Sequence, residues 1–126
     1  MKLRMKFITL GLLVSLGGVP QALAEEIAPG ITYEVLKEHD ASLLPGVTKI
    51  VESIFIMQPG TKIDFPASEA MHICTSMLGE ITATMGGKTI MRRAGDQWTE
   101  PKGMSMTLHN TGNVPYVDKT FEIFYE

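Results

Sequence analysis

The sequence predicts an all-β domain, a sandwich or barrel of short antiparallel strands. Three observations support this fold class. Short runs rich in β-branched and aromatic side chains follow one another along residues 31–125, and each has the length of a strand. Turns that contain glycine or proline separate these runs at regular spacing. After residue 24, no stretch of 12 residues has the 3.6-residue period of an amphipathic helix.

The first half of the predicted domain holds two expected strands. Residues 25–30 are expected to form a flexible lead-in. Residues 31–37 alternate apolar and polar side chains imperfectly, as a short edge strand does. The polar residues 38–46 end in a Pro-Gly turn and predict a loop. Residues 47–57 are rich in β-branched side chains and predict a strand, whereas residues 63–71 have no regular pattern.

The second half holds six more expected strands, two of them joined by a Gly-Gly pair that is typical of a hairpin. Trp98 lies in a short strand before a Pro-x-Gly turn and is expected to pack in the core. In the next strand Met104 and Met106 alternate with polar residues, so both should point to one face. The expected strands cover residues 72–78, 80–85, 89–93, 96–99, 104–109 and 116–125.

The N-terminus has the three parts of a bacterial secretory signal peptide. A basic segment precedes an uncharged apolar run, and an Ala-x-Ala motif ends at Ala24. The apolar run is shorter than a typical transmembrane span. We therefore expect cleavage after Ala24, which removes residues 1–24 and leaves no stable membrane anchor. The remaining domain, residues 25–126, is expected to be periplasmic or secreted.

Charge and cysteine content narrow the classes of partner. The whole chain has a formal net charge of −3, and removing the basic signal segment makes the domain more acidic. This charge argues against nucleic acid as a partner. Cys74 is the one cysteine, so an intramolecular disulfide is excluded. The thiol is expected to be buried as a small apolar group or to serve as a metal ligand.

The segment 95–115 carries a spaced motif. Gly95, Pro101, Gly103 and Asn110 fit the pattern G-x5-P-x-G-x2-H-x3-N. This pattern resembles the second conserved motif of the cupin family. In that family the histidine of the motif binds a metal, and here Met106 stands at its position.

An earlier segment fits the first cupin motif, G-x5-H-x-H-x3-E-x6-G, in the same incomplete way. Gly60 and Gly79 match its two glycines at the right spacing. Pro66, Ser68 and His72 stand where the family has two histidines and a glutamate. The frame of both motifs is therefore present, while the metal-binding side chains are replaced.

The resemblance to small single-domain bacterial cupins implies a jelly-roll β-barrel of two antiparallel sheets over residues 25–126. Cupins usually bind Fe, Mn, Ni or Zn through three histidines and one glutamate. Three of the four positions here hold proline, serine and methionine. Iron and manganese centres need nitrogen and carboxylate ligands, so the usual metal-dependent chemistry of the family is not expected.

The residues expected inside the barrel suggest a softer site. If His72 points inward, Cys74 does too, since side chains alternate along a strand. Met106 would face them from another strand, and Met104 and Trp98 would complete the interior wall. A His, Cys and Met set suits copper. The alternative is an apolar core that has lost its metal, with His72 as a hydrogen-bonded interior residue.

Several functions remain open from the sequence. The first is a non-enzymatic binding protein that holds a small or soft ligand in the barrel. The others are a copper-binding protein, an atypical metal-dependent cupin enzyme, and a partner-binding module without a ligand. No catalytic residues are identified. A homodimer is a further expectation, with the predicted edge strand from Ile31 as one route to it.

Overall fold

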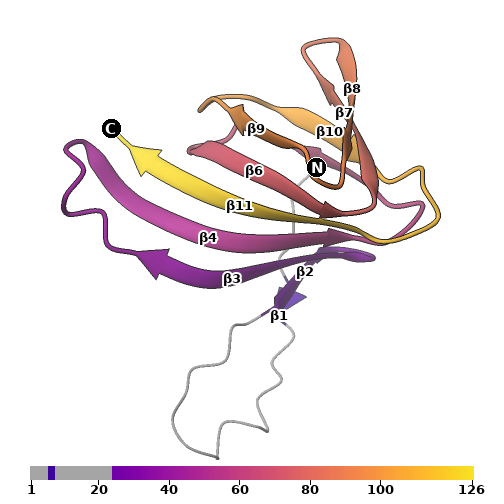
Figure 1. Ribbon diagram of the computed structural model, residues 1–126, viewed down its shortest axis with the longest axis horizontal. Coiled ribbons are helices and arrows are strands. Elements are labelled where there is room, and N and C mark those ends of the chain that lie inside the picture. Colours follow the sequence, from indigo (N-terminus) through magenta and orange to yellow (C-terminus); the bar gives the residue numbers. More distant parts are fainter. Residues whose placement is uncertain (1–5, 8–23) are drawn as a thin grey trace, which may run out of the picture.

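Two antiparallel β-sheets face each other in the computed structural model, which describes residues 6–7 and 24–126 (Figure 1). The larger sheet has seven strands in the spatial order β1 (Lys6–Phe7), β2 (Ala24–Ala28), β3 (Ile31–His39), β4 (Val47–Met57), β11 (Tyr116–Tyr125), β6 (Met71–Leu78) and β9 (Gln97–Glu100). The smaller sheet has four, in the order β5 (Lys62–Phe65), β10 (Met106–His109), β7 (Glu80–Met85) and β8 (Lys88–Arg93). The predicted all-β class with two antiparallel sheets is confirmed.

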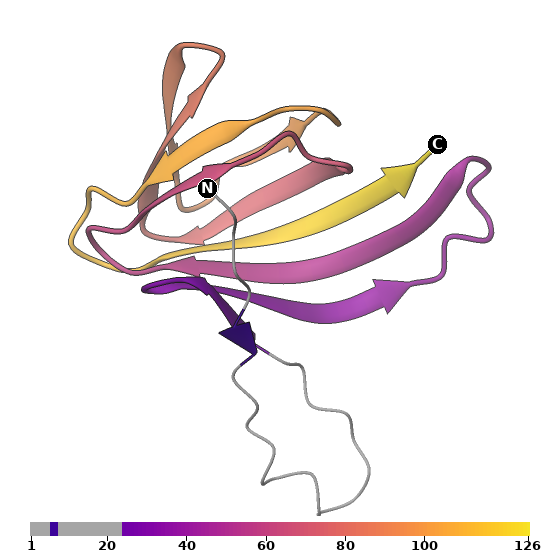
Figure 2. The ribbon, with the colours of Figure 1, turned by 180° about the vertical axis from the view of Figure 1, so that it is seen from behind.

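The long strands β3, β4 and β11 curve side by side beneath the smaller sheet, and the β7–β8 hairpin projects beyond it (Figures 1 and 2). The chain crosses between the sheets at Gly79, which joins β6 to β7. Gly79 has a φ of +72°, and a Cβ there would lie 2.5 Å from the carbonyl oxygen of Pro115. Only glycine fits this conformation and this close approach. The first-motif glycine therefore serves the fold and not a ligand.

The core lies between the sheets, where apolar side chains from both meet. Tyr116, Met57 and Ile31 of the larger sheet are fully buried, and Ile81 and Leu108 face them from the smaller sheet. These residues alternate with more exposed ones along their strands. This is the two-residue period that the sequence pattern predicted.

Asn110 of the second motif is fully buried and ties the turn after β10 to β4. Its Nδ2 donates hydrogen bonds to the carbonyl oxygens of Met57 at 2.9 Å and Val114 at 3.0 Å. Its Oδ1 accepts a hydrogen bond from the backbone N–H of Gly112 at 3.0 Å. Asn110 thus has a structural role, because its side chain bonds three backbone groups of β4 and the turn after β10.

Three expectations about single elements are wrong. The lead-in expected at residues 25–30 contains β2, which pairs with β3 and buries Ile27. Consequently β3 is not an edge strand, and the dimer route through it is closed by β2. The irregular segment 63–71 contains most of β5, whose four residues pair with β10. With five and four residues, β2 and β5 are too short for an alternating pattern to be recognised in the sequence. Pairing with the neighbouring strands stabilises their extended conformation.

The predicted signal peptide lies almost wholly outside the described residues. Of residues 1–24, the structure describes β1, which pairs with β2, and Ala24. The cleavage after Ala24 stays a prediction. No helix among the described residues has the length and apolar character needed to cross a membrane.

Candidate ligand and metal site inside the barrel

A cavity of about 290 Å³ lies between the two sheets. All five residues expected in the interior line it, namely His72, Cys74, Trp98, Met104 and Met106. They come from both sides: β6 and β9 of the larger sheet, and β10 of the smaller sheet with the residues before it. The cavity therefore gathers side chains that are far apart in the sequence.

The polar wall of the cavity is built from rows of side chains that run across neighbouring strands. His72 on β6 lies opposite Glu122 on β11 and opposite Glu100 on β9. The next inward residue, Cys74, lies opposite Thr120 and Trp98. Because cross-strand neighbours on one face are close together, this register brings three strands to one polar cluster.

Exposure falls steadily along this wall. The side chains of His72 and Glu122 are 21% and 19% exposed. At the other end, Ser76 and Tyr116 are 1% and 0% exposed and share a hydrogen bond of 2.7 Å. The mouth of the cavity thus lies at His72 and Glu122, and its floor includes Tyr116.

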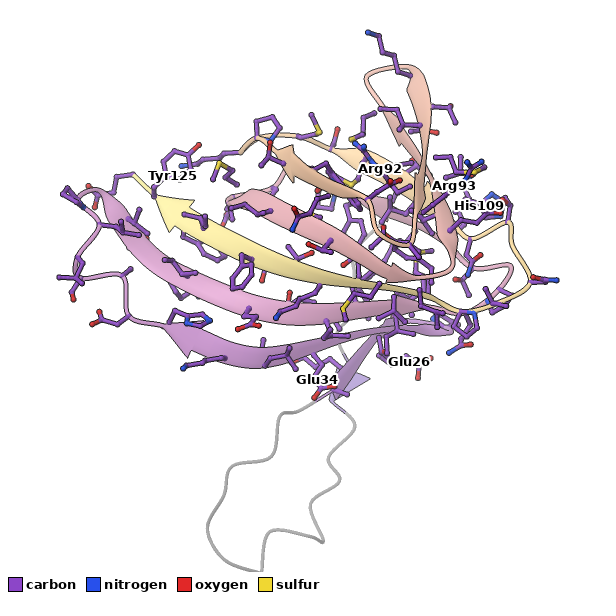
Figure 3. All side chains as sticks on the ribbon, in the orientation of Figure 1. Glu26, Glu34, Arg92, Arg93, His109 and Tyr125 are labelled. Atoms are coloured by element: carbon purple, nitrogen blue, oxygen red, sulfur yellow. The ribbon has the colours of Figure 1, made fainter. Side chains whose placement is uncertain are left out.

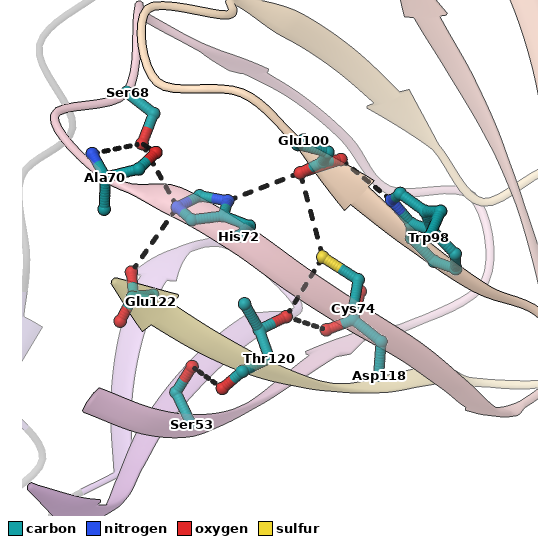
Figure 4. A network of polar contacts seen from close by, with 10 residues as sticks. All are labelled: Ser53, Ser68, Ala70, His72, Cys74, Trp98, Glu100, Asp118, Thr120 and Glu122. Atoms are coloured by element: carbon teal, nitrogen blue, oxygen red, sulfur yellow. Dashed lines mark hydrogen bonds and ion pairs between the residues drawn. The ribbon is translucent and has the colours of Figure 1, made fainter. Parts of the chain in front are cut away.

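Glu100 is the centre of the polar cluster (Figure 4). Its Oε1 lies 3.3 Å from His72 Nδ1 and accepts a hydrogen bond from Cys74 Sγ at 3.8 Å. Its Oε2 accepts a hydrogen bond from Trp98 Nε1 at 3.0 Å. Burial alone would raise the pKa of Glu100, but the hydrogen bonds from His72 and Trp98 outweigh burial and hold that pKa below its usual value.

The same cluster favours the charged form of His72. Burial would lower the pKa of His72, but the hydrogen bond and charge of Glu100, together with the charge of Glu122, raise it above the usual value. Nε2 lies 3.1 Å from the Ser68 hydroxyl and 4.0 Å from Glu122. Since Ser68 donates its one hydrogen to the carbonyl of Ala70, it accepts the hydrogen of Nε2. Both ring nitrogens therefore donate.

Burial raises the pKa of two other groups on this wall. Burial raises the pKa of the Cys74 thiol far above its ordinary value, so the thiol keeps its proton. Burial also raises the pKa of Asp118 to about 7, although Thr120 donates a hydrogen bond to its Oδ1 at 3.2 Å. The three carboxyl groups of this wall, Glu100, Asp118 and Glu122, thus carry a smaller total negative charge than three ionised carboxylates would.

Comparison with known proteins identifies the architecture. No family model matches the sequence, and no curated protein sequence matches it. Solved structures do match. The cupin domain of an XRE-family transcriptional regulator from Enterobacter cloacae has a TM-score of 0.65 at 16% identity, over 77% of this chain and 98% of that one. The protein has the cupin fold.

Two further structures agree with this assignment. The cupin domain of Cnp3 from Schizosaccharomyces pombe has a TM-score of 0.63 at 14% identity, over 85% of this chain and 80% of that one. A predicted oxalate decarboxylase from Thermotoga maritima has a TM-score of 0.60 at 20% identity, over 76% and 81%. At these identities the likeness establishes the cupin fold alone.

The usual cupin metal site does not fit this chain. Pro66, Ser68, His72 and Met106, which the sequence resemblance assigns to the four metal positions, all line the cavity. The motif positions therefore face inward as in a cupin barrel. However, proline offers no side-chain donor, and a thioether is a poor ligand for Fe(II) or Mn(II). Among the described residues, the lining of the cavity contains one histidine, so it does not supply the three histidines of the usual set.

A different set of donors lies beside the motif. His72, Cys74 and Glu100 each place one ligand atom within 4.8 Å of the other two, and such a group could hold a metal ion. Met106, which the sequence placed in the metal set, lines the same cavity from β10 of the facing sheet. Sequence reasoning missed Glu100 as a partner of His72. The available signal was its phase, since Glu100 is two residues from Trp98 and shares its face.

Proposed function

We propose that this protein binds a small, largely apolar molecule in its cupin barrel, without the usual cupin metal chemistry. The cavity carries this proposal. Its volume of about 290 Å³ is at the lower end of the range for small-molecule sites, about 300–1,000 Å³. Its apolar wall includes Phe55, Ile81 and Leu108, and its polar wall is the cluster around Glu100. Apolar walls with a few placed polar groups are typical of ligand sites.

Trp98 provides a direct test, because it is the one tryptophan of the chain and lines the cavity. We would titrate the protein with the neutral fluorescent probe N-phenylnaphthylamine and follow energy transfer from Trp98. Ala83→Phe should fill the cavity, since Ala83 lines it and is 4% exposed. The matched control is Thr84→Phe, which adds the same ring on the exposed face of β7.

We expect Ala83→Phe to weaken probe binding about tenfold or more and Thr84→Phe to leave it unchanged. Overpacking costs about 1–3 kcal/mol, so an unfolding curve of each variant is recorded first. Met104→Phe, which also narrows the cavity, replaces Ala83→Phe if that variant does not fold. Equal probe binding in all variants, or no probe binding by the wild type, would rule out an accessible barrel site.

We further propose that the mature protein is periplasmic or secreted and begins at Glu25, as the signal-peptide pattern predicts. Intact-mass measurement of the protein expressed with its leader in a bacterial host tests this proposal, together with fractionation of the cells. A cytoplasmic protein that retains residues 1–24 would overturn it.

A second candidate function is metal binding at His72, Cys74 and Glu100. Metal–ligand bonds of about 2.0–2.3 Å place ligand atoms about 3.3–3.7 Å apart around a tetrahedral ion. The measured separations from Glu100 Oε1 are 3.3 Å to His72 Nδ1 and 3.8 Å to Cys74 Sγ. A nitrogen, sulfur and oxygen set suits Zn²⁺ or Cu²⁺. The Cys74 thiol and the Nδ1 of a charged His72 must each lose a proton on binding, so metal affinity should rise with pH.

Metal content by mass spectrometry tests this second function. We would measure the protein as purified and after loading with Zn²⁺, Cu²⁺ or Cu(I), for the wild type and His72→Ala. His39→Ala is the matched control, because His39 also pairs with a glutamate, Glu52, at 2.8 Å, and neither residue lines the cavity. About one ion per chain, lost only in His72→Ala, supports the site. A metal-free protein after all three loadings would rule it out.

A further inference from the structure

Arg92 lies at the seam where the two sheets meet. It belongs to β8, the edge strand of the smaller sheet, and pairs with the buried Ile81. Its guanidinium carbon lies 4.4 Å from the centre of the Trp98 ring, and Trp98 belongs to β9, the edge strand of the larger sheet. Both side chains line the cavity. Arg92 therefore places a fixed positive charge on the cavity wall.

This charge has no counter-ion among the described residues. The Nε of Arg92 is buried and has no hydrogen-bond partner. The neighbouring Arg93 differs, because its exposed side chain pairs with Glu80 at 3.5 Å (Figure 3 labels both arginines). A buried polar group without a partner costs about 1–3 kcal/mol, and more when it is charged. Such a group in a cavity wall calls for an explanation.

The acidic groups of the cavity are already partnered inside the protein. Glu100 accepts hydrogen bonds from three side chains. Glu122 accepts one from the Tyr33 hydroxyl, and Asp118 accepts one from Thr120. The cavity thus offers one cation with a buried donor that has no partner and three carboxyl groups that each accept a hydrogen bond within the protein. This asymmetry favours an anionic group on the ligand.

The geometry of Arg92 further restricts the kind of anion. The guanidinium carbon lies over the indole ring of Trp98, and this cation–π contact holds the charge at one place on the cavity wall. Two parallel N–H donors match the two oxygens of a carboxylate. The neighbouring wall is an aromatic ring and aliphatic side chains, which suit an apolar body beside that carboxylate.

We propose that Arg92 is the anion anchor of the barrel and that its ligand is a small carboxylic acid with an aromatic or apolar body. This proposal rests on the proposed ligand-binding function and names the class of its ligand. The alternative role of Arg92 is a clamp between β8 and β9. A clamp would change stability and would not discriminate between charged and neutral ligands.

Benzoate and benzamide form the test pair, because they have nearly the same shape and differ in charge. Binding of each would be followed by Trp98 fluorescence and calorimetry. We expect the wild type to bind benzoate at least tenfold more tightly, since a hydrogen bond to a charged group contributes about 1.5–3 kcal/mol. Arg92→Gln should abolish this preference. Arg93→Gln, one residue away and on the outer face, should retain it.

The outcomes separate this proposal from the function on which it rests. If benzamide binds as tightly as benzoate in the wild type, the anchor is wrong while barrel binding stands. The same conclusion follows if Arg93→Gln loses the preference as much as Arg92→Gln. If neither benzoate, benzamide nor the neutral naphthylamine probe binds, both proposals fail. If Arg92→Gln does not fold, Arg92→Lys replaces it. Arg92→Lys keeps the positive charge but loses the paired N–H donors, so it should show a reduced preference for benzoate.

Discussion

The indole N–H of Trp98 donates a hydrogen bond of 3.0 Å to Glu100 Oε2. This bond joins the apolar wall of the cavity to its polar cluster, since the opposite oxygen of Glu100 meets His72 and Cys74. The same indole ring carries Arg92 on its face. Trp98 therefore links the two charged groups of the cavity. Its ring contacts the guanidinium of Arg92, and its N–H bonds the carboxylate of Glu100.

Glu100→Gln should lower the pKa of His72 and destabilise the protein by about 1.5–3 kcal/mol, because a charged acceptor of three hydrogen bonds is lost. The raised pKa of His72 stabilises the fold below its unfolded pKa, and this contribution is lost as pH rises through the folded value. In Glu100→Gln, the stability contribution of His72 should therefore depend less on pH. Proton NMR of the His72 ring and urea unfolding measure both effects. Glu80→Gln is the surface control, and an unchanged His72 titration contradicts the prediction.

Asp118→Asn should stabilise the protein at neutral and alkaline pH. Burial raises the pKa of Asp118 to about 7, so the folded state binds more protons than the unfolded state between about pH 4 and 7. Wild-type stability must therefore fall as pH rises through this window, by up to about 4 kcal/mol. Asparagine cannot ionise and should remove this slope. Unfolding curves from pH 4 to 8 check the prediction, and identical slopes in both proteins would refute it.

Asn110→Ala should destabilise the fold by about 2–4 kcal/mol, because it removes one buried and two partly buried hydrogen bonds to the backbone. The control is Asn113→Ala in the same turn, where the side chain is exposed and the cost should be below about 0.5 kcal/mol. Chemical denaturation compares the two variants. Similar stabilities would mean that the motif asparagine does not hold the turn.

Gly79→Ala should be far more costly than Gly87→Ala, although both glycines have positive φ, +72° and +77°. A new Cβ at Gly79 meets the backbone of Pro115 at 2.5 Å, whereas one at Gly87 meets open space. The left-handed conformation alone costs about 1–2 kcal/mol, which is the loss expected for Gly87→Ala. Gly79→Ala should add a steric cost and exceed about 3 kcal/mol in thermal or urea unfolding. Equal losses would show that the close approach relaxes without penalty.

The alternation within single strands was enough to place individual side chains. His72 and Cys74 are two residues apart on one strand, so a common face follows from the geometry of the chain. The Gly-Gly hairpin and the glycines of the two motifs were visible for a similar reason, because turns have local backbone requirements. These features depend on residues that are neighbours in the sequence.

The partners of those side chains depend on contacts over a longer range. Glu100 meets His72 because β9 pairs with β6 in one register, and a shift of one residue would turn Glu100 outward. Arg92 meets Trp98 because the edges of two sheets close on each other. By itself the sequence determined the all-β class, the Gly-Gly and Pro-x-Gly turns, and the common face of His72 and Cys74. Only the tertiary structure decided the partners and charge of the site, because register and sheet packing are set by the whole core.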